Sequence, residues 1–357
     1  MEKQKMTWKR EDLIDFLIKK GNGIKGLSEL KLAKIPDDFI QPPHQRLSHT
    51  KVATQHSIPI IDVSNWDDPR VSQSICAAAA DWGFFQIINH GIPIGVLQDV
   101  KNATHDFFNL PVAERSKYLK ENSPTPSIVL KTSFSHSVDK VLEWKDSLLH
   151  FTGTHDDGSH LWPNLTRDRV LEYTKLARPV IGNLVSVLLS GINVQQKQTQ
   201  SDLVGSVDVS LLCYPKCPNP DLASGATPHS DVSVLTLLLQ DDVGGLYVRA
   251  SQGEDQWIHV EPMEGALIVN VGDVLEIMSN GKYKSIEHRV FLVSGDVDRV
   301  SVPLFVIPPR DALIGPLPEA LHIGEKPIYR QIVFSDYFNR AFSKPPNGKQ
   351  TIDYVRV

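Results

Sequence analysis

The chain has 357 residues, of which 41% are apolar, and this is enough for a large buried core. Its net charge of −5, without any block of Lys or Arg, argues against nucleic acid and anionic membranes as partners. No apolar run has the length of a spanning helix, and the charged Met1–Lys5 start lacks the apolar core of a signal peptide. Three cysteines without framework spacing favour a reducing compartment. We therefore expect a cytoplasmic monomer.

The first half of the chain predicts helices interleaved with a few strands. Apolar side chains at helical spacing or alanine-rich runs indicate the helices, and Gly21, Gly23 and Gly26 are interpreted as the break after the first one. Pro179 predicts a kink in the longest helix. The expected helices are residues 8–20, a second that starts at Leu27 and stops near Pro36, 71–82, 94–108 and 170–192, with a short one after Pro111. The expected strands are 58–62, 84–89, 148–151 and one within 127–134. Residues 153–160 are expected to form a polar loop.

After residue 205 the pattern changes to short strands separated by turn residues, followed by a helix over residues 329–342. Such a series favours an antiparallel sandwich or barrel over a parallel sheet. We expect a mixed α/β fold with a mainly β core, divided into a helical region 1–204 whose early strands complete the barrel, a core 205–310, and a C-terminal helix and tail 311–357. The expected strands of this part are 207–214, 233–240, 245–249, 256–260, 266–271, 286–293 and 299–306.

A candidate metal site is formed by His229, Asp231 and His288. Residues two apart on a strand face the same side, so His229 and Asp231 are expected to point together into the barrel. Taken alone, neither motif identifies a metal site. An HxD pattern arises often by chance on a protein surface, and a lone histidine in a strand is more often a hydrogen-bonded core residue than a ligand. Taken together, two imidazoles and one carboxylate are the ligand set that holds ferrous iron and leaves coordination positions open.

Arg299 and Ser301 follow on the next expected strand. A guanidinium binds a carboxylate through two parallel hydrogen bonds, and a hydroxyl two residues away adds a donor on the same strand face. This pattern predicts a site for an acidic co-substrate beside the metal. The alternative is that Arg299 lies at a solvent-exposed strand end.

The chain resembles the plant Fe(II)/2-oxoglutarate-dependent dioxygenases over nearly its whole length. The resemblance rests on several motifs, which are Ile58–Asp62, Trp82–Gly91, Tyr214–Pro218, His229–Asp231, Leu235–Asp241, Asn270–Asp273, Ser279–Ser285, Glu287–Arg289 and Arg299–Ser301. It implies a double-stranded β-helix, or jelly roll, flanked by N-terminal and C-terminal helices. It also implies Fe(II), 2-oxoglutarate and O2, with ascorbate as reductant, and it adds Tyr214 to Arg299 and Ser301 as residues that bind 2-oxoglutarate. No catalytic residue is expected beyond the metal centre.

Within this family the chain is most similar to the hydroxycinnamoyl-CoA ortho-hydroxylases of coumarin biosynthesis. Segments that carry this similarity include Lys20–Leu27, Ala103–Pro111, Thr132–Ser135 and Glu143–Asp146. The resemblance implies ortho-hydroxylation of feruloyl-CoA or p-coumaroyl-CoA, leading to scopoletin or umbelliferone. The partner would be a small aromatic or acyl-CoA molecule. Alternatives are the same chemistry on a free coumarin or another aromatic metabolite, zinc-dependent hydrolysis with the same ligands, and a non-catalytic binding protein on this fold.

The chain departs from its relatives near the expected pocket. Leu212 stands where the family usually has asparagine. The pair Leu130-Lys131 stands where relatives tend to have an aromatic and a small residue, and Thr227-Pro228 replaces a pair that often ends in a basic residue. The expected pocket residues are Lys131, Phe134, Leu212 and Phe305. For both phenylalanines, plain core packing is the alternative.

Overall fold

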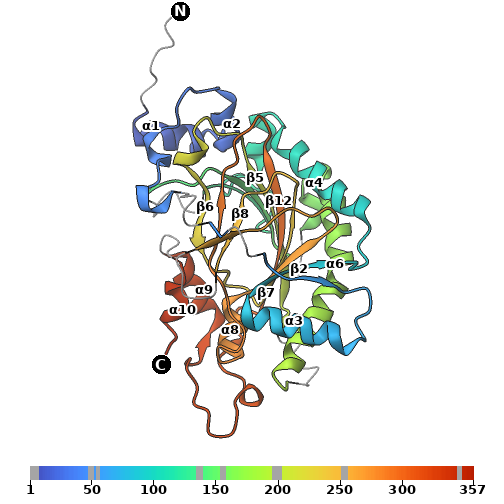
Figure 1. Ribbon diagram of the computed structural model, residues 1–357. Coiled ribbons are helices and arrows are strands. Elements are labelled where there is room, and N and C mark those ends of the chain that lie inside the picture. Colours follow the sequence, from blue (N-terminus) through green and yellow to red (C-terminus); the bar gives the residue numbers. More distant parts are fainter. Residues whose placement is uncertain are drawn as a thin grey trace, which may run out of the picture.

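The structure is a computed structural model, and it describes residues 8–46, 52–53, 57–133, 140–152, 158–194, 203–250, 256–343 and 348–357. Within these ranges, two β-sheets form the centre and helices cover the outer face of the larger one (Figure 1). The large sheet has the strand order β1-β2-β10-β7-β12-β5-β4-β3, and the small sheet has the order β6-β11-β8-β9.

Among the named strands of the described residues, β1 and β2 pair in parallel and every other pair is antiparallel. The large sheet contains β1 (Ile60–Asp62), β2 (Phe84–Ile88), β3 (Ile128–Thr132), β4 (Asp146–His150), β5 (Ser206–Tyr214), β7 (Leu235–Gln240), β10 (Leu267–Val271) and β12 (Arg299–Ile307). The small sheet contains β6 (Ser224–His229), β8 (Leu246–Arg249), β9 (Trp257–His259) and β11 (His288–Phe291), and a separate pair is formed by β13 (Leu313–Ile314) and β14 (Ile332–Val333).

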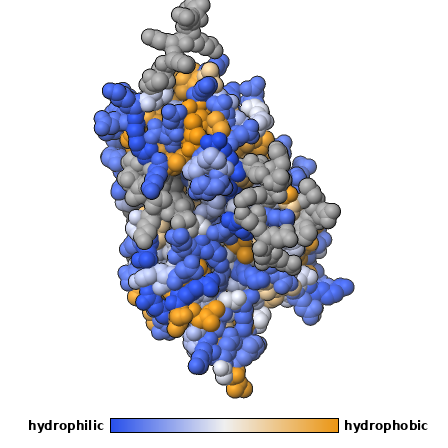
Figure 2. All heavy atoms as spheres, turned by 60° about the vertical axis from the view of Figure 1, so that its left-hand side comes forward, coloured by the Kyte–Doolittle hydropathy of each residue, from blue (hydrophilic) through white to orange (hydrophobic). Residues whose placement is uncertain are grey.

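The helices lie in three groups. The helices against the large sheet are α3 (Pro69–Asp81), α4 (Ile94–Phe108) and α6 (Asn164–Gly191). The N-terminal helices are α1 (Arg10–Ile14), continued by a π-helical turn over Asp15–Lys19, and α2 (Gly23–Glu29). The remaining helices are α5 (Val112–Arg115), α8 (Asp273–Met278), α9 (Phe334–Phe342) and α10 (Gln350–Asp353). Among the described helices, none combines the length and apolar character that crossing a lipid bilayer requires. The face seen in Figure 2 is mostly hydrophilic with scattered apolar patches.

Side-chain alternation along the strands divides the interior into two cores. In β12, Val300, Val302 and Leu304 face the helices and are fully buried, while the alternate residues face the small sheet. The core between the sheets combines Phe84 and Ile268 of the large sheet with residues of the small one. Two facing, mainly antiparallel sheets with flanking helices form a double-stranded β-helix, so the predicted fold class is confirmed. The domain boundaries remain a prediction.

The helix predicted from Leu27 to about Pro36 is wrong, because the helix in this region is α2, which ends at Glu29, and residues 31–36 are not helical. The Asp146 carboxylate accepts hydrogen bonds from the backbone N–H groups of Ile24 and Lys25, so the N-terminus of α2 is capped by a residue distant in sequence. Gly23 permits this close approach, since a Cβ there would lie 2.6 Å from Asp146 Oδ2. A glycine interpreted as a helix breaker therefore begins a helix.

Several further elements were not predicted, namely β6, α8, β13, β14 and α10. β6 contains Gly225 and Pro228, which are typical of loops, but it is an edge strand, where a missing backbone N–H is tolerated. Two other elements are shorter than predicted, since β11 covers only His288–Phe291 and α9 begins at Phe334, after β14.

Candidate metal centre and co-substrate site

The ends of β6 and β11 bring His229, Asp231 and His288 together. One potential ligand atom from each residue lies within 4.8 Å of the other two. The Nε2 atoms of His229 and His288 are 3.8 and 3.7 Å from Asp231 Oδ1, and the two imidazole ring centres are 4.3 Å apart. Three donors that converge on one point, all of them nitrogen or oxygen, suit a ferrous ion.

Backbone carbonyl groups orient both imidazole rings. His229 Nδ1 lies 2.7 Å from the Thr227 carbonyl oxygen, and His288 Nδ1 lies 3.3 Å from that of Ile286. Because a carbonyl oxygen only accepts, each Nδ1 carries the proton and donates it, and Nε2 keeps its lone pair for a metal.

Asp231 reaches the cluster from a turn and not from a strand. The strand β6 ends at His229, so the alternation expected for residues 229 and 231 does not place the carboxylate. Its Oδ2 accepts hydrogen bonds from Thr236 Oγ1 at 2.6 Å and Asn270 Nδ2 at 2.8 Å, which leaves Oδ1 facing the histidines. Thr236 and Asn270 were not predicted as site residues, although both lie in segments on which the resemblance in the sequence analysis rests, Leu235–Asp241 and Asn270–Asp273.

Burial and charge act in opposite directions on the carboxylate. Burial alone would raise the pKa of Asp231, but His288, His229 and the hydrogen bonds from Thr236 and Asn270 hold it below the ordinary value. Burial and the neighbouring His229 lower the pKa of His288 to about 4. At neutral pH the cluster therefore offers an ionised carboxylate and a neutral His288 imidazole, the forms that bind metals.

Arg299 is buried on the inner face of β12, with 4% of its surface exposed, so the alternative of a solvent-exposed strand end is wrong. Its Nη1 donates to Ser301 Oγ at 3.1 Å, and its Nε donates to the Gly244 carbonyl. Tyr214 is its cross-strand partner on β5, and the guanidinium lies 4.8 Å from the centre of the Tyr214 ring. The three residues predicted to bind 2-oxoglutarate therefore form one group.

The strand register places three of the predicted pocket residues on the same inner face. Lys131 pairs with Ser147, which pairs with Leu212, which pairs with Ser301. Directly opposite residues of a sheet share a face, so Lys131 and Leu212 face the same side as Ser301. Phe305 lies on this face by alternation and pairs with Thr236. The fourth residue, Phe134, lies outside the described residues.

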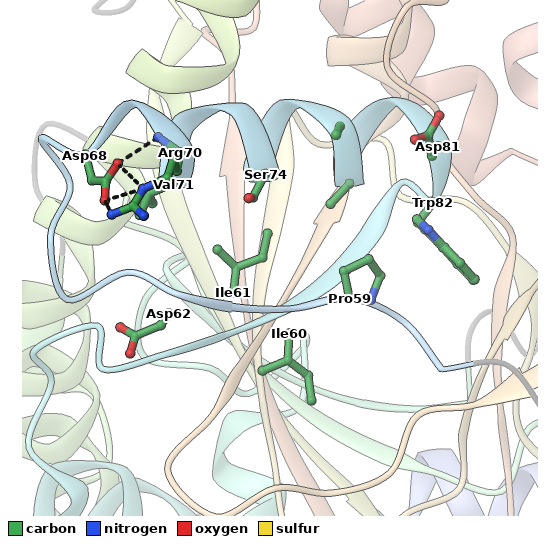
Figure 3. Close-up of a pocket in the computed structure, with 12 residues that line it drawn as sticks. Pro59, Ile60, Ile61, Asp62, Asp68, Arg70, Val71, Ser74, Asp81 and Trp82 are labelled. Carbon is green, nitrogen blue, oxygen red and sulfur yellow. Dashed lines mark hydrogen bonds and ion pairs between the residues drawn. The ribbon is translucent and has the colours of Figure 1, made fainter.

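A separate surface groove of about 570 Å³ runs between β1 and α3 (Figure 3). In Figure 3, Ile61 points toward α3, and the carboxylate of Asp68 binds the Arg70 side chain at the start of that helix. None of the residues lining this groove belongs to the predicted metal or co-substrate site.

Two sequence families match the chain. Residues 206–308 match the 2OG-Fe(II) oxygenase superfamily, and residues 58–167 match the family described as non-haem dioxygenase in morphine synthesis N-terminal. The first match contains the whole metal cluster together with Tyr214, Arg299 and Ser301.

Characterised relatives match over almost the full length. The chain is 50% identical to a bi-functional coumaroyl CoA and feruloyl CoA ortho-hydroxylase of Ipomoea batatas, over 97% of both chains. It is 48% identical to another bi-functional enzyme of this kind from Ruta graveolens, over 97% of this chain and 95% of that protein. It is 47% identical to feruloyl CoA ortho-hydroxylase 1 of Arabidopsis thaliana, over 97% of this chain and 96% of that protein.

Solved structures show the same fold. The crystal structure of JOX2 in complex with 2OG, Fe and JA superposes with a TM-score of 0.83 at 32% identity, covering 94% of this chain and 97% of that one. The rice dioxygenase for auxin oxidation superposes with a TM-score of 0.72 at 21% identity, covering 84% of this chain and 100% of that one.

Proposed function

This chain belongs to the 2OG-Fe(II) oxygenase superfamily, and we propose that it ortho-hydroxylates a hydroxycinnamoyl-CoA thioester, feruloyl-CoA or p-coumaroyl-CoA. One observation carries the proposal. The chain matches ortho-hydroxylases of these thioesters over 97% of its length, with a three-residue metal cluster and Arg299 inside the matched region. It is an enzyme of the oxidoreductase class, and iron and 2-oxoglutarate are the cofactor and co-substrate of its family.

In this proposal His229, His288 and Asp231 would hold the iron, with both histidine Nε2 atoms and Asp231 Oδ1 as the available donors. Arg299, with Ser301 and Tyr214, binds a carboxylate of 2-oxoglutarate. The iron, once bound, would supply the oxidising chemistry that places oxygen on the aromatic ring, with 2-oxoglutarate and O2 as the reactants consumed, and ascorbate would keep the iron in the ferrous state. The residues of the chain bind and orient the two organic molecules, and no further side chain is needed as an acid or base.

Lys131, Leu212 and Phe305 are proposed to contact the substrate. Leu212 lies in the sheet next to Ser301, where its apolar side chain suits an aromatic ring. Lys131 is exposed at the edge strand β3, three strands from Ser301, where a cation suits the anionic CoA portion. After hydroxylation and trans–cis isomerisation, attack of the new hydroxyl on the thioester carbonyl would break the C–S bond. This step would release a coumarin lactone, with the hydroxyl proton carried by the free CoA thiol.

We further propose a cytoplasmic location and a monomeric state. Cys76, Cys213 and Cys217 are free thiols, and Cys213 is fully buried in the core, as expected in a reducing compartment. Light scattering of the purified protein tests the monomer, and imaging of a fluorescent fusion tests the location.

A product assay tests the substrate. The purified protein with Fe(II), 2-oxoglutarate and ascorbate is incubated with feruloyl-CoA, p-coumaroyl-CoA or free scopoletin. The expected products are scopoletin from feruloyl-CoA and umbelliferone from p-coumaroyl-CoA. Turnover of scopoletin, but of neither thioester, would show that the substrate is a free coumarin. Absence of succinate with every substrate, in a folded protein, would favour a binding protein.

A further inference from the structure

The segment Glu143–Asp146 is one of those singled out in the sequence analysis, but none of its residues was assigned to the metal and co-substrate site. It leads into β4 of the large sheet and also contacts β6 of the small sheet, since the backbone N–H of Trp144 donates to the Ser224 carbonyl at 2.8 Å. Trp144 and Asp146 have structural contacts. Trp144 Nε1 donates to the Pro215 carbonyl and Asp146 caps α2. Glu143 and Lys145 remain to be explained.

Glu143 is a buried carboxylate whose contacts lead toward the metal cluster. Its Oε1 accepts hydrogen bonds from both the backbone N–H and the hydroxyl of Thr227, each at 2.7 Å. Its Oε2 forms an ion pair with Lys145 Nζ at 2.7 Å. Burial alone would raise the pKa of Glu143, but Lys145 and the Thr227 hydrogen bonds hold it below the ordinary value, so the group is charged at neutral pH.

Thr227 connects this carboxylate to a predicted iron ligand. The Thr227 carbonyl accepts the proton of His229 Nδ1 at 2.7 Å, and this hydrogen bond orients His229 Nε2 toward Asp231. The N–H and the hydroxyl of Thr227 both donate to Glu143. Glu143 therefore fixes the orientation of Thr227, and the Thr227 carbonyl in turn orients the His229 ring. A continuous set of contacts therefore runs from Lys145 through Glu143 and Thr227 to His229.

The second histidine is held differently. His288 Nδ1 contacts the Ile286 carbonyl at a longer 3.3 Å, and its ring packs against Phe84 at 5.1 Å between centres. Its side chain is 11% exposed, whereas that of His229 is 30% exposed. Packing restrains His288, while the more exposed His229 depends on its hydrogen bond to Thr227.

We propose that Glu143 is a positioning residue of the metal centre, which acts through Thr227 to fix the His229 ring and thereby to retain the iron. The inference depends on the proposed role of His229 as a ligand. The proposal also gives a role to Thr227, the first residue of the Thr227-Pro228 pair that departs from the family pattern. The hydroxyl of Thr227 supplies one of the two donors to Glu143. A purely structural role, in which Glu143 only joins the two sheets, would leave metal affinity unchanged.

The test uses Co(II), whose visible absorption bands report binding without turnover. The full-length chain is titrated as wild type, Glu143→Ala, Glu143→Gln and Thr227→Val, and the melting temperature of each metal-free protein is recorded. Glu143→Ala is expected to weaken Co(II) binding by about 10- to 100-fold, the usual effect of removing a group that supports a ligand. Glu143→Gln keeps an acceptor oxygen, and Thr227→Val keeps the carbonyl, so smaller losses are expected.

Glu287→Gln is the matched control. It breaks a comparable 2.7 Å ion pair, with Arg249, beside the other histidine. Within the described residues, however, the Glu287 side chain makes no hydrogen bond to Ile286, whose carbonyl holds the His288 ring, whereas the Glu143 side chain binds Thr227. Its Co(II) affinity is expected to stay within about 2-fold of wild type, below the range for groups that support a ligand. Wild-type affinity in Glu143→Ala, or an equal loss in Glu287→Gln, would overturn the inference. Should Glu143→Ala fail to fold, Glu143→Gln with wild-type affinity would overturn it. A His288→Ala variant that still binds Co(II) would instead refute the proposed metal site itself.

Discussion

His229 and His288 lie directly opposite each other on the antiparallel strands β6 and β11, although they are far apart in the sequence. Opposite residues share one face of a sheet, so both rings point toward the same space between the two sheets. The Asp231 carboxylate enters that space from the turn that follows β6 and lies nearly equally far from both Nε2 atoms. A three-donor site results from one strand pair and one turn.

Removal of one ring is expected to abolish the metal site. The His288→Ala variant retains only His229 and Asp231, and two donors hold a ferrous ion poorly. We expect metal affinity to fall by more than about 100-fold, since loss of a supporting group alone costs 10- to 100-fold. Co(II) titration and 2-oxoglutarate-dependent succinate formation measure the effect. Circular dichroism should show a folded barrel, and succinate at the wild-type rate would refute the ligand assignment.

Arg299→Lys separates co-substrate binding from metal binding. Lysine keeps the positive charge but loses the planar fork, which donates to both Ser301 and the Gly244 carbonyl. Loss of a hydrogen bond to a charged group costs about 1.5–3 kcal/mol, so KM for 2-oxoglutarate should rise about 10- to 100-fold. Co(II) affinity without 2-oxoglutarate serves as the control and should not change. An unaltered KM would exclude Arg299 from the co-substrate site.

The sequence was sufficient to predict what depends on local pattern. Alternation in β12 places Arg299 and Ser301 on one face, and the HxD pattern brings two of the three cluster residues close together. Strand alternation does not explain the position of Asp231, however, because β6 ends at His229. The segment after β6 carries the Asp231 carboxylate, and hydrogen bonds from Thr236 and Asn270 orient it.

The rest depends on contacts between distant segments, which a local pattern does not contain. The series Lys131, Ser147, Leu212 and Ser301 follows from the register of four strands, and register is fixed only when the strands pair. The link from Glu143 to Thr227 joins the two sheets for the same reason. In both cases the residue types are visible in the sequence while their neighbours are not.

Gly23→Ala should destabilise the protein through the start of α2. Gly23 has a φ of +66°, and an added Cβ would lie 2.6 Å from Asp146 Oδ2, the carboxylate that caps the helix. Left-handed strain together with a displaced cap should cost about 2–4 kcal/mol of unfolding free energy, measured by urea denaturation. Gly95→Ala in α4 is the control, because a Cβ there would meet no described atom within 4 Å other than those of the adjacent residues and of the helix's own backbone. There a gain of up to about 1 kcal/mol is expected, and equal effects at both sites would contradict this account.

His150 should make the protein less stable in mild acid. It is fully buried, and its ring lies 4.7 Å from that of Trp162. Burial lowers the pKa of His150 to about 3 in the folded protein, against 6.5 as its ordinary value. Above pH 6.5 both folded and unfolded chains hold it neutral, and between pH 6.5 and 3 only the unfolded chain binds the proton.

The unfolding free energy should therefore fall by about 1.4 kcal/mol per pH unit below 6.5 on account of this residue, or about 2 kcal/mol at pH 5. Urea denaturation of wild type and His150→Leu at pH 8 and pH 5 measures the effect. The difference in unfolding free energy between the two proteins isolates His150 from all other titrating groups. It should shift by about 2 kcal/mol in favour of the variant at pH 5, because leucine has no proton to bind. Parallel pH profiles would show that His150 binds a proton equally well in the folded protein, and would contradict its burial as an uncharged ring.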